Sequence, residues 1–128
     1  MPVTVRRRSL SALGAIGAIV LLALSGCASG PQVEHTDETT EVTVTVQGMH
    51  YMPDVIEVPV GNELVVTFTN TGDVMHDLVF ANGSRTPHVA PGDSRVVEVG
   101  VVAADMDGWC DIGNHRAQGM ELVVRAIG

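Results

Sequence analysis

Residues 110–120 read CDIGNHRAQGM and connect two strand-like runs near the end of the chain. The segment holds three candidate metal donors, the thiol of Cys110, the imidazole of His115 and the thioether of Met120, at successive spacings of five residues. His76 precedes another strand-like run, 34 residues upstream of Cys110, and is the best candidate for a second imidazole. In antiparallel neighbours, the start of one strand meets the end of the next. We therefore expect these four side chains to converge.

This donor set has a specific chemistry. Two imidazoles and a thiolate in one plane, with a weak and distant axial thioether, form a mononuclear electron-transfer copper site. We expect His76, Cys110, His115 and Met120 to hold one copper ion. Each residue alone has a simpler interpretation, as an inert buried thiol, a hydrogen-bonded histidine or core packing. Their order, spacing and position beside strands favour the joint interpretation.

From Glu41 onward the sequence has the pattern of short strands separated by turns. Valines alternate with polar residues over residues 42–47, as in a half-buried strand. We expect further strands at residues 55–60, 64–69, 77–80, 95–101, just before Cys110, and at 121–127. About seven to eight short strands, punctuated by Gly and Pro and without a helical period, predict an all-β fold. A Greek-key β-sandwich is the favoured architecture, and a barrel is the alternative.

The first 26 residues have the features of an export signal. Arginines at 6–8 precede an apolar run over residues 10–24, which at fifteen residues is shorter than the roughly 20 of a membrane span. The run ends in LSGC at residues 24–27, which resembles a bacterial lipobox, where the signal is cut before a lipidated cysteine. We expect residues 1–26 to be a lipoprotein signal peptide and Cys27 to be lipidated. An ordinary signal peptide or a membrane anchor is the alternative.

The chain after the expected signal peptide divides into a tether and a folded domain. Residues 27–40 are polar and acidic, and we expect a flexible tether, with the folded domain at 41–128. The protein would be an exported lipoprotein, anchored on the extracytoplasmic side of a membrane, in the periplasm or at the cell surface. Lipidation of Cys27 would leave Cys110 as the one free thiol, which metal ligation would protect.

Charge restricts the partners. Without residues 1–26, four arginines remain against fifteen acidic residues, so the formal charge is −11, and there is no lysine. Such a surface repels nucleic acid, which is bound through cationic contacts to phosphate. We expect a monomer whose partners are redox proteins or a copper acceptor, with a basic contact patch on the partner.

Residues 42–127 resemble the cupredoxins, the small blue copper proteins. Beyond the four donors, the resemblance is carried by GMHYMP at 48–53, IEVPVG at 56–61, VVTFTN at 65–70 and Pro-Gly at 91–92. It implies a type 1 copper site with His76, Cys110 and His115 as equatorial ligands and Met120 as the axial ligand. It also implies one-electron transfer rather than enzymatic turnover.

The C-x4-H-x4-M loop is also similar to that of multicopper oxidases, and the differences are informative. In those enzymes, histidines flank the blue-copper cysteine and reach a trinuclear copper cluster. Here the flanking residues are Trp109 and Asp111, and residues 77–81 contain no histidine. Five histidines in the whole chain are too few for a cluster beside a mononuclear site. We therefore do not expect an enzyme with an oxygen-reducing centre.

Three alternatives to an electron carrier stay open. The first is a copper-binding or delivery protein on the same fold. The second is an enzyme with metal at subunit borders, and the third is a copper-free adhesion or sensor domain. Retained copper during reversible redox cycling, against copper transfer to an acceptor, separates the carrier from the delivery protein.

Several residues around the four donors have expected roles of their own. We expect His115 to be the electron port, because its loop should reach the surface, and Asn70 or a neighbour to hold the His76 loop. Met52 is expected in the core and Met75 at the rim. Six further residues could be metal donors: Met49, His50, Met52, Met75, His88 and Met106. We expect the methionines to pack in the core or at the rim and the histidines to lie in solvated loops. A second copper site is the alternative.

Overall fold

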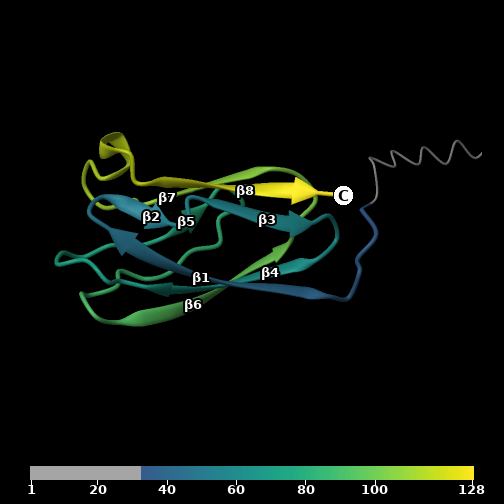
Figure 1. The fold of residues 1–128 in the computed structure, drawn as a ribbon, viewed down its shortest axis with the longest axis horizontal. Coiled ribbons are helices and arrows are strands. Elements are labelled where there is room, and N and C mark those ends of the chain that lie inside the picture. Colours follow the sequence, from purple (N-terminus) through teal and green to yellow (C-terminus); the bar gives the residue numbers. More distant parts are fainter. Residues whose placement is uncertain (1–32) are drawn as a thin grey trace, which may run out of the picture. The chain divides into compact units, whose positions relative to one another are not determined.

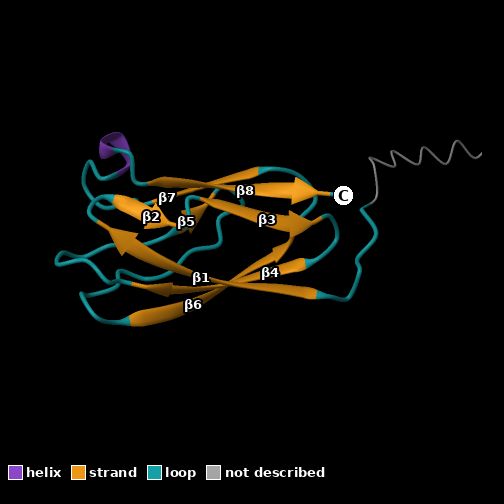
Figure 2. Cartoon of the chain, in the orientation of Figure 1, coloured by secondary structure: helices purple, strands orange, loops and turns teal. Residues whose placement is uncertain are grey.

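The computed structural model describes residues 33–128, which form two facing four-stranded sheets (Figure 1). This arrangement confirms the expected all-β sandwich. The proposed signal peptide, Cys27 and the first part of the tether lie outside the described residues. Within residues 33–128 the helical structure is one 3₁₀ turn, η1 (Arg116–Gln118), drawn in purple in Figure 2. The described part contains no helix with the length and apolar character needed to cross a membrane.

Each sheet mixes parallel and antiparallel pairs. The first has the order β2-β1-β4-β6 and the second has the order β3-β8-β7-β5. The pairs β1–β4 and β3–β8 are parallel, and the remaining pairs are antiparallel. The strand bounds are β1 (Thr39–Gln47), β2 (His50–Met52), β3 (Val55–Pro59), β4 (Glu63–Thr69), β5 (Val79–Phe80), β6 (Ser94–Val101), β7 (Met106–Trp109) and β8 (Glu121–Ile127).

The structure corrects three details of the expected strands. β2 was not expected, because three residues are too few to show a period. The strand expected at 77–80 begins only at Val79, since the Leu78 N–H bonds to the Thr86 hydroxyl at 3.1 Å instead of joining a ladder. β1 begins at Thr39, so the last two residues of the expected tether belong to the sheet, where they pair with β4.

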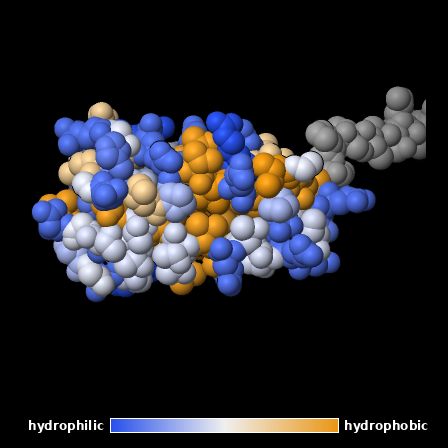
Figure 3. Space-filling view, viewed as in Figure 1, coloured by the Kyte–Doolittle hydropathy of each residue, from blue (hydrophilic) through white to orange (hydrophobic). Residues whose placement is uncertain are grey.

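The core lies between the sheets and consists mainly of Val and Leu with three aromatic residues. Tyr51 and Phe68 pack edge to face, with ring centroids 5.9 Å apart and an interplanar angle of 79°. This geometry suits the aromatic quadrupoles. Figure 3 shows further apolar residues in the middle of the viewed face, around β3. Met52, expected in the core, is instead 48% exposed on β2.

Two adjacent valines in β6 test which face of the sheet points inward. Val97 is 5% exposed and Val96 is 63% exposed. Val97→Ala should lower the free energy of unfolding by about 2 kcal/mol, because it removes buried methyl groups and leaves a cavity. Val96→Ala should change it by no more than about 0.5 kcal/mol. Urea unfolding of the full-length chain measures both, and equal losses would contradict the assignment of faces.

Candidate metal centre

The site lies where β5 begins and β7 ends. These strands are antiparallel, and Val79 is paired with Trp109, so the segment before β5 meets the segment after β7. His76 is held there by two backbone bonds to Val89, with N–O distances of 3.2 and 2.7 Å. Cys110 directly follows β7. The expected meeting of the two strand ends at one rim is therefore present.

The loop after Cys110 folds back on itself. The Met120 carbonyl accepts a bond from the Cys110 N–H at 3.1 Å, and the Met120 N–H donates to the His115 carbonyl at 3.2 Å. Gly119 ends η1 with a φ of 99°, a left-handed conformation that suits glycine. These bonds bring His115 back beside Cys110.

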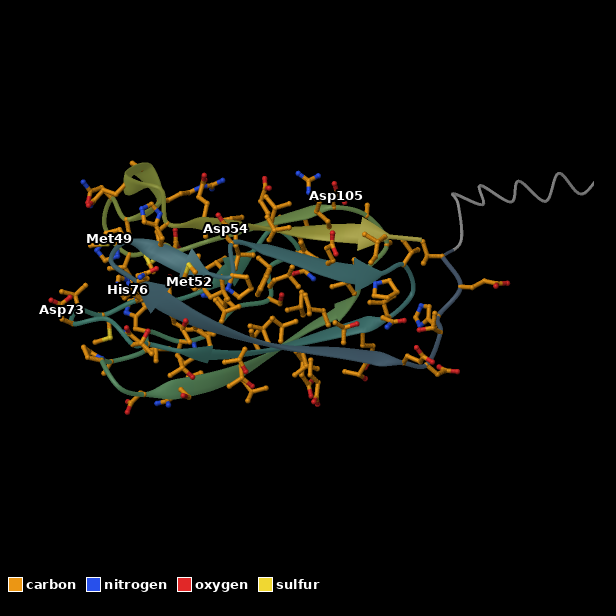
Figure 4. All side chains as sticks on the ribbon, viewed as in Figure 1. Met49, Met52, Asp54, Asp73, His76 and Asp105 are labelled. Atoms are coloured by element: carbon orange, nitrogen blue, oxygen red, sulfur yellow. The ribbon has the colours of Figure 1, made fainter. Side chains whose placement is uncertain are left out.

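Three of the four expected donors converge. One donor atom each from His76, Cys110 and His115 lies within 4.8 Å of the other two. The Cys110 sulfur is 3.5 Å from His115 Nδ1, and the two imidazole centroids are 5.1 Å apart. Met120, the expected axial donor, is fully buried in the core cluster that also contains Cys110. Figure 4 shows His76 at the end of the sandwich that also carries Met49 and Asp73.

The donor groups are buried without the partners that buried polar groups normally have. His76 is 0% exposed, and neither ring nitrogen has a hydrogen-bond partner. Such an unsatisfied group costs about 1–3 kcal/mol. Burial, followed by the neighbouring His115, lowers the pKa of His76, so the ring is neutral and has a free lone pair. A metal ion would satisfy that nitrogen, and a mixed imidazole and thiol set fits copper.

Burial also affects the protonation of the Cys110 thiol. Burial raises the pKa of Cys110, and backbone hydrogen bonds from Asp77 and Ile112 act in the opposite direction. The metal-free protein therefore holds a neutral thiol, and a metal ion would displace its proton. The described residues include one free cysteine, Cys110.

Asn70 holds the loop that carries His76, as expected. The buried Asn70 side chain donates to the carbonyls of Val74 and Val89, both at 2.8 Å, and accepts from the Gly72 N–H at 3.0 Å. These bonds tie both ends of the loop to the segment that pairs with His76.

A second clamp holds the loop after Cys110. The Arg116 guanidinium lies 4.2 Å from the centre of the Trp109 ring, and its Nε is 2.7 Å from the Glu121 carboxylate. Arg116 thus connects the residue before Cys110 with the first residue of β8 across the loop. Trp109 thus packs beside the metal loop.

Two functional residues were missed by sequence reasoning. Asp77 was assigned to a strand, but its buried carboxylate accepts the Asp111 N–H at 2.7 Å. The signal available in the sequence is that Asp77 and Asp111 have the same 34-residue spacing as His76 and Cys110. Tyr51 donates its hydroxyl to the Asp77 carbonyl, and burial raises the pKa of Tyr51, so the hydroxyl keeps its proton.

The remaining candidates occupy varied positions. His115 is only half-buried, as an electron port requires, and Met75 lies at the rim with 43% exposure. Met49 and Met106 pack against the core, and His88 is an exposed residue that faces Asp77. Among residues 33–128, one group of at least three His, Cys, Asp or Glu side chains converges, and it is the group described above.

Comparisons with known proteins agree with this fold. The family model for the cupredoxin-like domain matches residues 15–123, whereas a search of curated proteins gave no match. An auracyanin from Roseiflexus castenholzii superimposes with a TM-score of 0.62 at 19% identity, over 71% of this chain and 99% of that one. Auracyanin B gives 0.60 at 17% identity, over 77% and 96%. A copper-containing nitrite reductase from Thermus scotoductus gives 0.54 at 21% identity, over 70% of this chain but only 23% of the enzyme. The fold and the His–Cys–His group together indicate copper binding.

The hydrogen bonds of Asn70 predict that even a substitution that keeps its shape lowers stability. Asn70→Ala should lower the free energy of unfolding by about 2–4 kcal/mol, because it removes the bonds to the carbonyls of Val74 and Val89 and from the Gly72 N–H, and leaves a cavity at a fully buried side chain. Asn70→Asp should be at least as destabilising, since it places a carboxylate oxygen against those carbonyls. Asn114→Asp is the control, because Asn114 is exposed and only accepts a bond from Gln118. Urea unfolding compares the three, and a mild Asn70→Asp variant would contradict the assigned bonds.

Proposed function

The chain belongs to the family of cupredoxin-like domains, and we propose that it is a blue copper protein that transfers single electrons through one type 1 copper site. The observation that carries the proposal is the fully buried His76, with both ring nitrogens unpartnered, beside the Cys110 thiol and His115.

The chain's residues would divide the work at the site. His76, Cys110, His115 and Met120 would hold the copper ion. Bound copper would supply one-electron chemistry by alternating between Cu(II) and Cu(I), so a donor loses one electron and an acceptor gains it. The bonds of Asn70 and the bonds within the Cys110 loop keep the donors in place, so little rearrangement accompanies the change of charge.

His115 is the proposed point of electron entry and exit. It is half-buried, and its neighbours Arg116, Ala117 and Gly119 are exposed. A partner can therefore approach the imidazole edge closely. The acidic surface, with four arginines against fifteen acids in residues 33–128, favours a partner with a basic contact patch.

The match to complete small proteins supports a carrier rather than an enzyme. The chain covers 99% of an auracyanin but 23% of the nitrite reductase. The described residues offer one convergent His and Cys group, and it has the composition of a mononuclear site.

Replacement of Cys110 tests the proposal. The full-length chain loaded with Cu(II) should show an intense visible charge-transfer band and narrow copper hyperfine splitting in electron paramagnetic resonance. Cys110→Ser should abolish both signals, because they arise from the copper–thiolate bond. His88→Ala is the matched control, since His88 is 62% exposed and is not a proposed ligand. A wild-type spectrum of ordinary tetragonal copper would contradict the proposal and favour copper delivery.

We also propose that Cys27 carries a lipid that anchors the protein on the extracytoplasmic side of a membrane. Its support is the arginines at 6–8, the apolar run at 10–24 and the sequence LSGC at 24–27. Cells fed a labelled fatty acid should incorporate the label into the wild-type chain and into Cys110→Ser, but not into Cys27→Ala. Label that persists in Cys27→Ala would overturn the assignment.

A further inference from the structure

Asp77 is a buried carboxylate directly after a proposed copper ligand. It is 0% exposed, and it is the one acidic residue in the buried part of residues 33–128. One carboxylate oxygen accepts the Asp111 N–H at 2.7 Å. The other lies 3.1 Å from an Arg85 guanidinium nitrogen and 3.7 Å from His88 Nε2. A buried charge is tolerated only when it is paired and hydrogen-bonded, and these contacts meet that requirement.

Arg85 joins three segments around the site. It pairs with Asp77, and a second nitrogen lies 3.7 Å from the Asp111 carboxylate. Its backbone forms a β-bridge with Val79 in β5. Arg85 is also 46% exposed, so solvent screens its charge more than it screens the buried carboxylate. The pairing therefore neutralises Asp77 only in part.

A neutral side chain would suffice for the backbone contact alone. The Asp111 N–H needs one acceptor oxygen, which an amide also provides. The carboxylate adds a negative charge beside the donors, and a negative charge favours the more highly charged Cu(II) over Cu(I). Asp77 can therefore act on the site in two ways, through its hydrogen bond to the Asp111 N–H and through its negative charge.

We propose that Asp77 is a positioning residue for the copper site and that Arg85 is its counter-charge. Through the Asp111 N–H, Asp77 holds the segment of His76 against the segment of Cys110 before any metal arrives. Through their opposite charges, Asp77 lowers the reduction potential of the site and Arg85 raises it. The effect on the reduction potential rests on the proposed function. The positioning role concerns the metal-free chain.

Four variants of the full-length chain test the pair. Asp77→Asn keeps the shape and the acceptor oxygen but removes the charge. Arg85→Gln removes the counter-charge, and the double variant removes both charges. Arg125→Gln is the matched control, because Arg125 forms an exposed ion pair with Asp105 at 3.4 Å. Figure 4 shows Asp105 far from His76, toward the opposite end of the sandwich.

The first readout uses the metal-free protein. Arg85→Gln should lower the urea midpoint more than Arg125→Gln does, because it leaves a buried carboxylate unpaired. Adding Asp77→Asn to Arg85→Gln should recover most of that loss, since no buried charge then remains. The amide resonance of Asp111 should shift in Asp77→Asn and in Arg85→Gln and stay in place in Arg125→Gln.

The second readout is the reduction potential of the copper-loaded protein. At a fixed applied potential, Arg85→Gln should raise the ratio of oxidised to reduced protein at least about threefold, and Asp77→Asn should lower it at least about threefold. In the Asp77→Asn background, Arg85→Gln should raise the ratio less, because without the Asp77 carboxylate the half-exposed guanidinium is no longer held beside the site. Arg125→Gln should leave the ratio unchanged, because its charge is distant and screened.

Several results would overturn the proposal. One is that Arg85→Gln has the same effect as Arg125→Gln on both the urea midpoint and the ratio of oxidised to reduced protein. Another is that Arg85→Gln has the same effect in the wild type and in the Asp77→Asn background. If Arg85→Gln does not fold, the double variant must fold, and its failure would also reject the pairing. Absence of the copper–thiolate band in the wild type would reject the proposed function, while the metal-free readouts would still decide whether Arg85 is the counter-charge of Asp77.

Discussion

The antiparallel pair of β5 and β7 sets where the metal donors can lie. Val79 opposite Trp109 fixes the register, so His76 and Cys110 leave the sheet at the same rim. A slip of one residue would turn each side chain of the strand to the other face. The bond from the Asp111 N–H to Asp77 continues the contact beyond the last strand pair, at 2.7 Å. The other contacts of the site support this pairing.

The site combines a rigid frame with unsatisfied donors. Asn70 fixes the His76 loop through three bonds, and Arg116 stacks on Trp109 while it pairs with Glu121. Inside that frame, the His76 ring nitrogens have no partner. The folded chain thus retains a local cost of about 1–3 kcal/mol in the metal-free state. A frame of this kind suits a metal that must change charge without moving its ligands.

Charge is distributed unevenly around the donors. Asp77 is buried and Arg85 is half-exposed, whereas the ion pairs of Arg116 and Arg125 lie at the surface. Surface pairs contribute little, typically about 0–1 kcal/mol, because water and salt screen them. The Asp77–Arg85 pair differs because one partner is out of contact with water. Asp77 is the buried charge that lies beside the donors in the described chain.

Local patterns in the sequence were enough to predict several features of the protein. Alternating valines predicted β1, and the spacing of Cys110, His115 and Met120 predicted one loop that folds back. The residue types alone predicted copper, because soft thiol and imidazole donors suit that metal. The start of β5 was wrongly placed at Asp77, since the Thr86 hydroxyl competes with the sheet for the backbone.

Contacts between residues far apart in the chain depend on the three-dimensional fold. The exposure of Met52 and the buried pair of Asp77 and Arg85 have no period or motif that marks them, and β2 is too short to show a period. Whether an acidic residue is buried depends on which strands cover it, and that depends on register. Periodicity reports which side of a strand faces inward, but it does not report which distant side chain lies opposite.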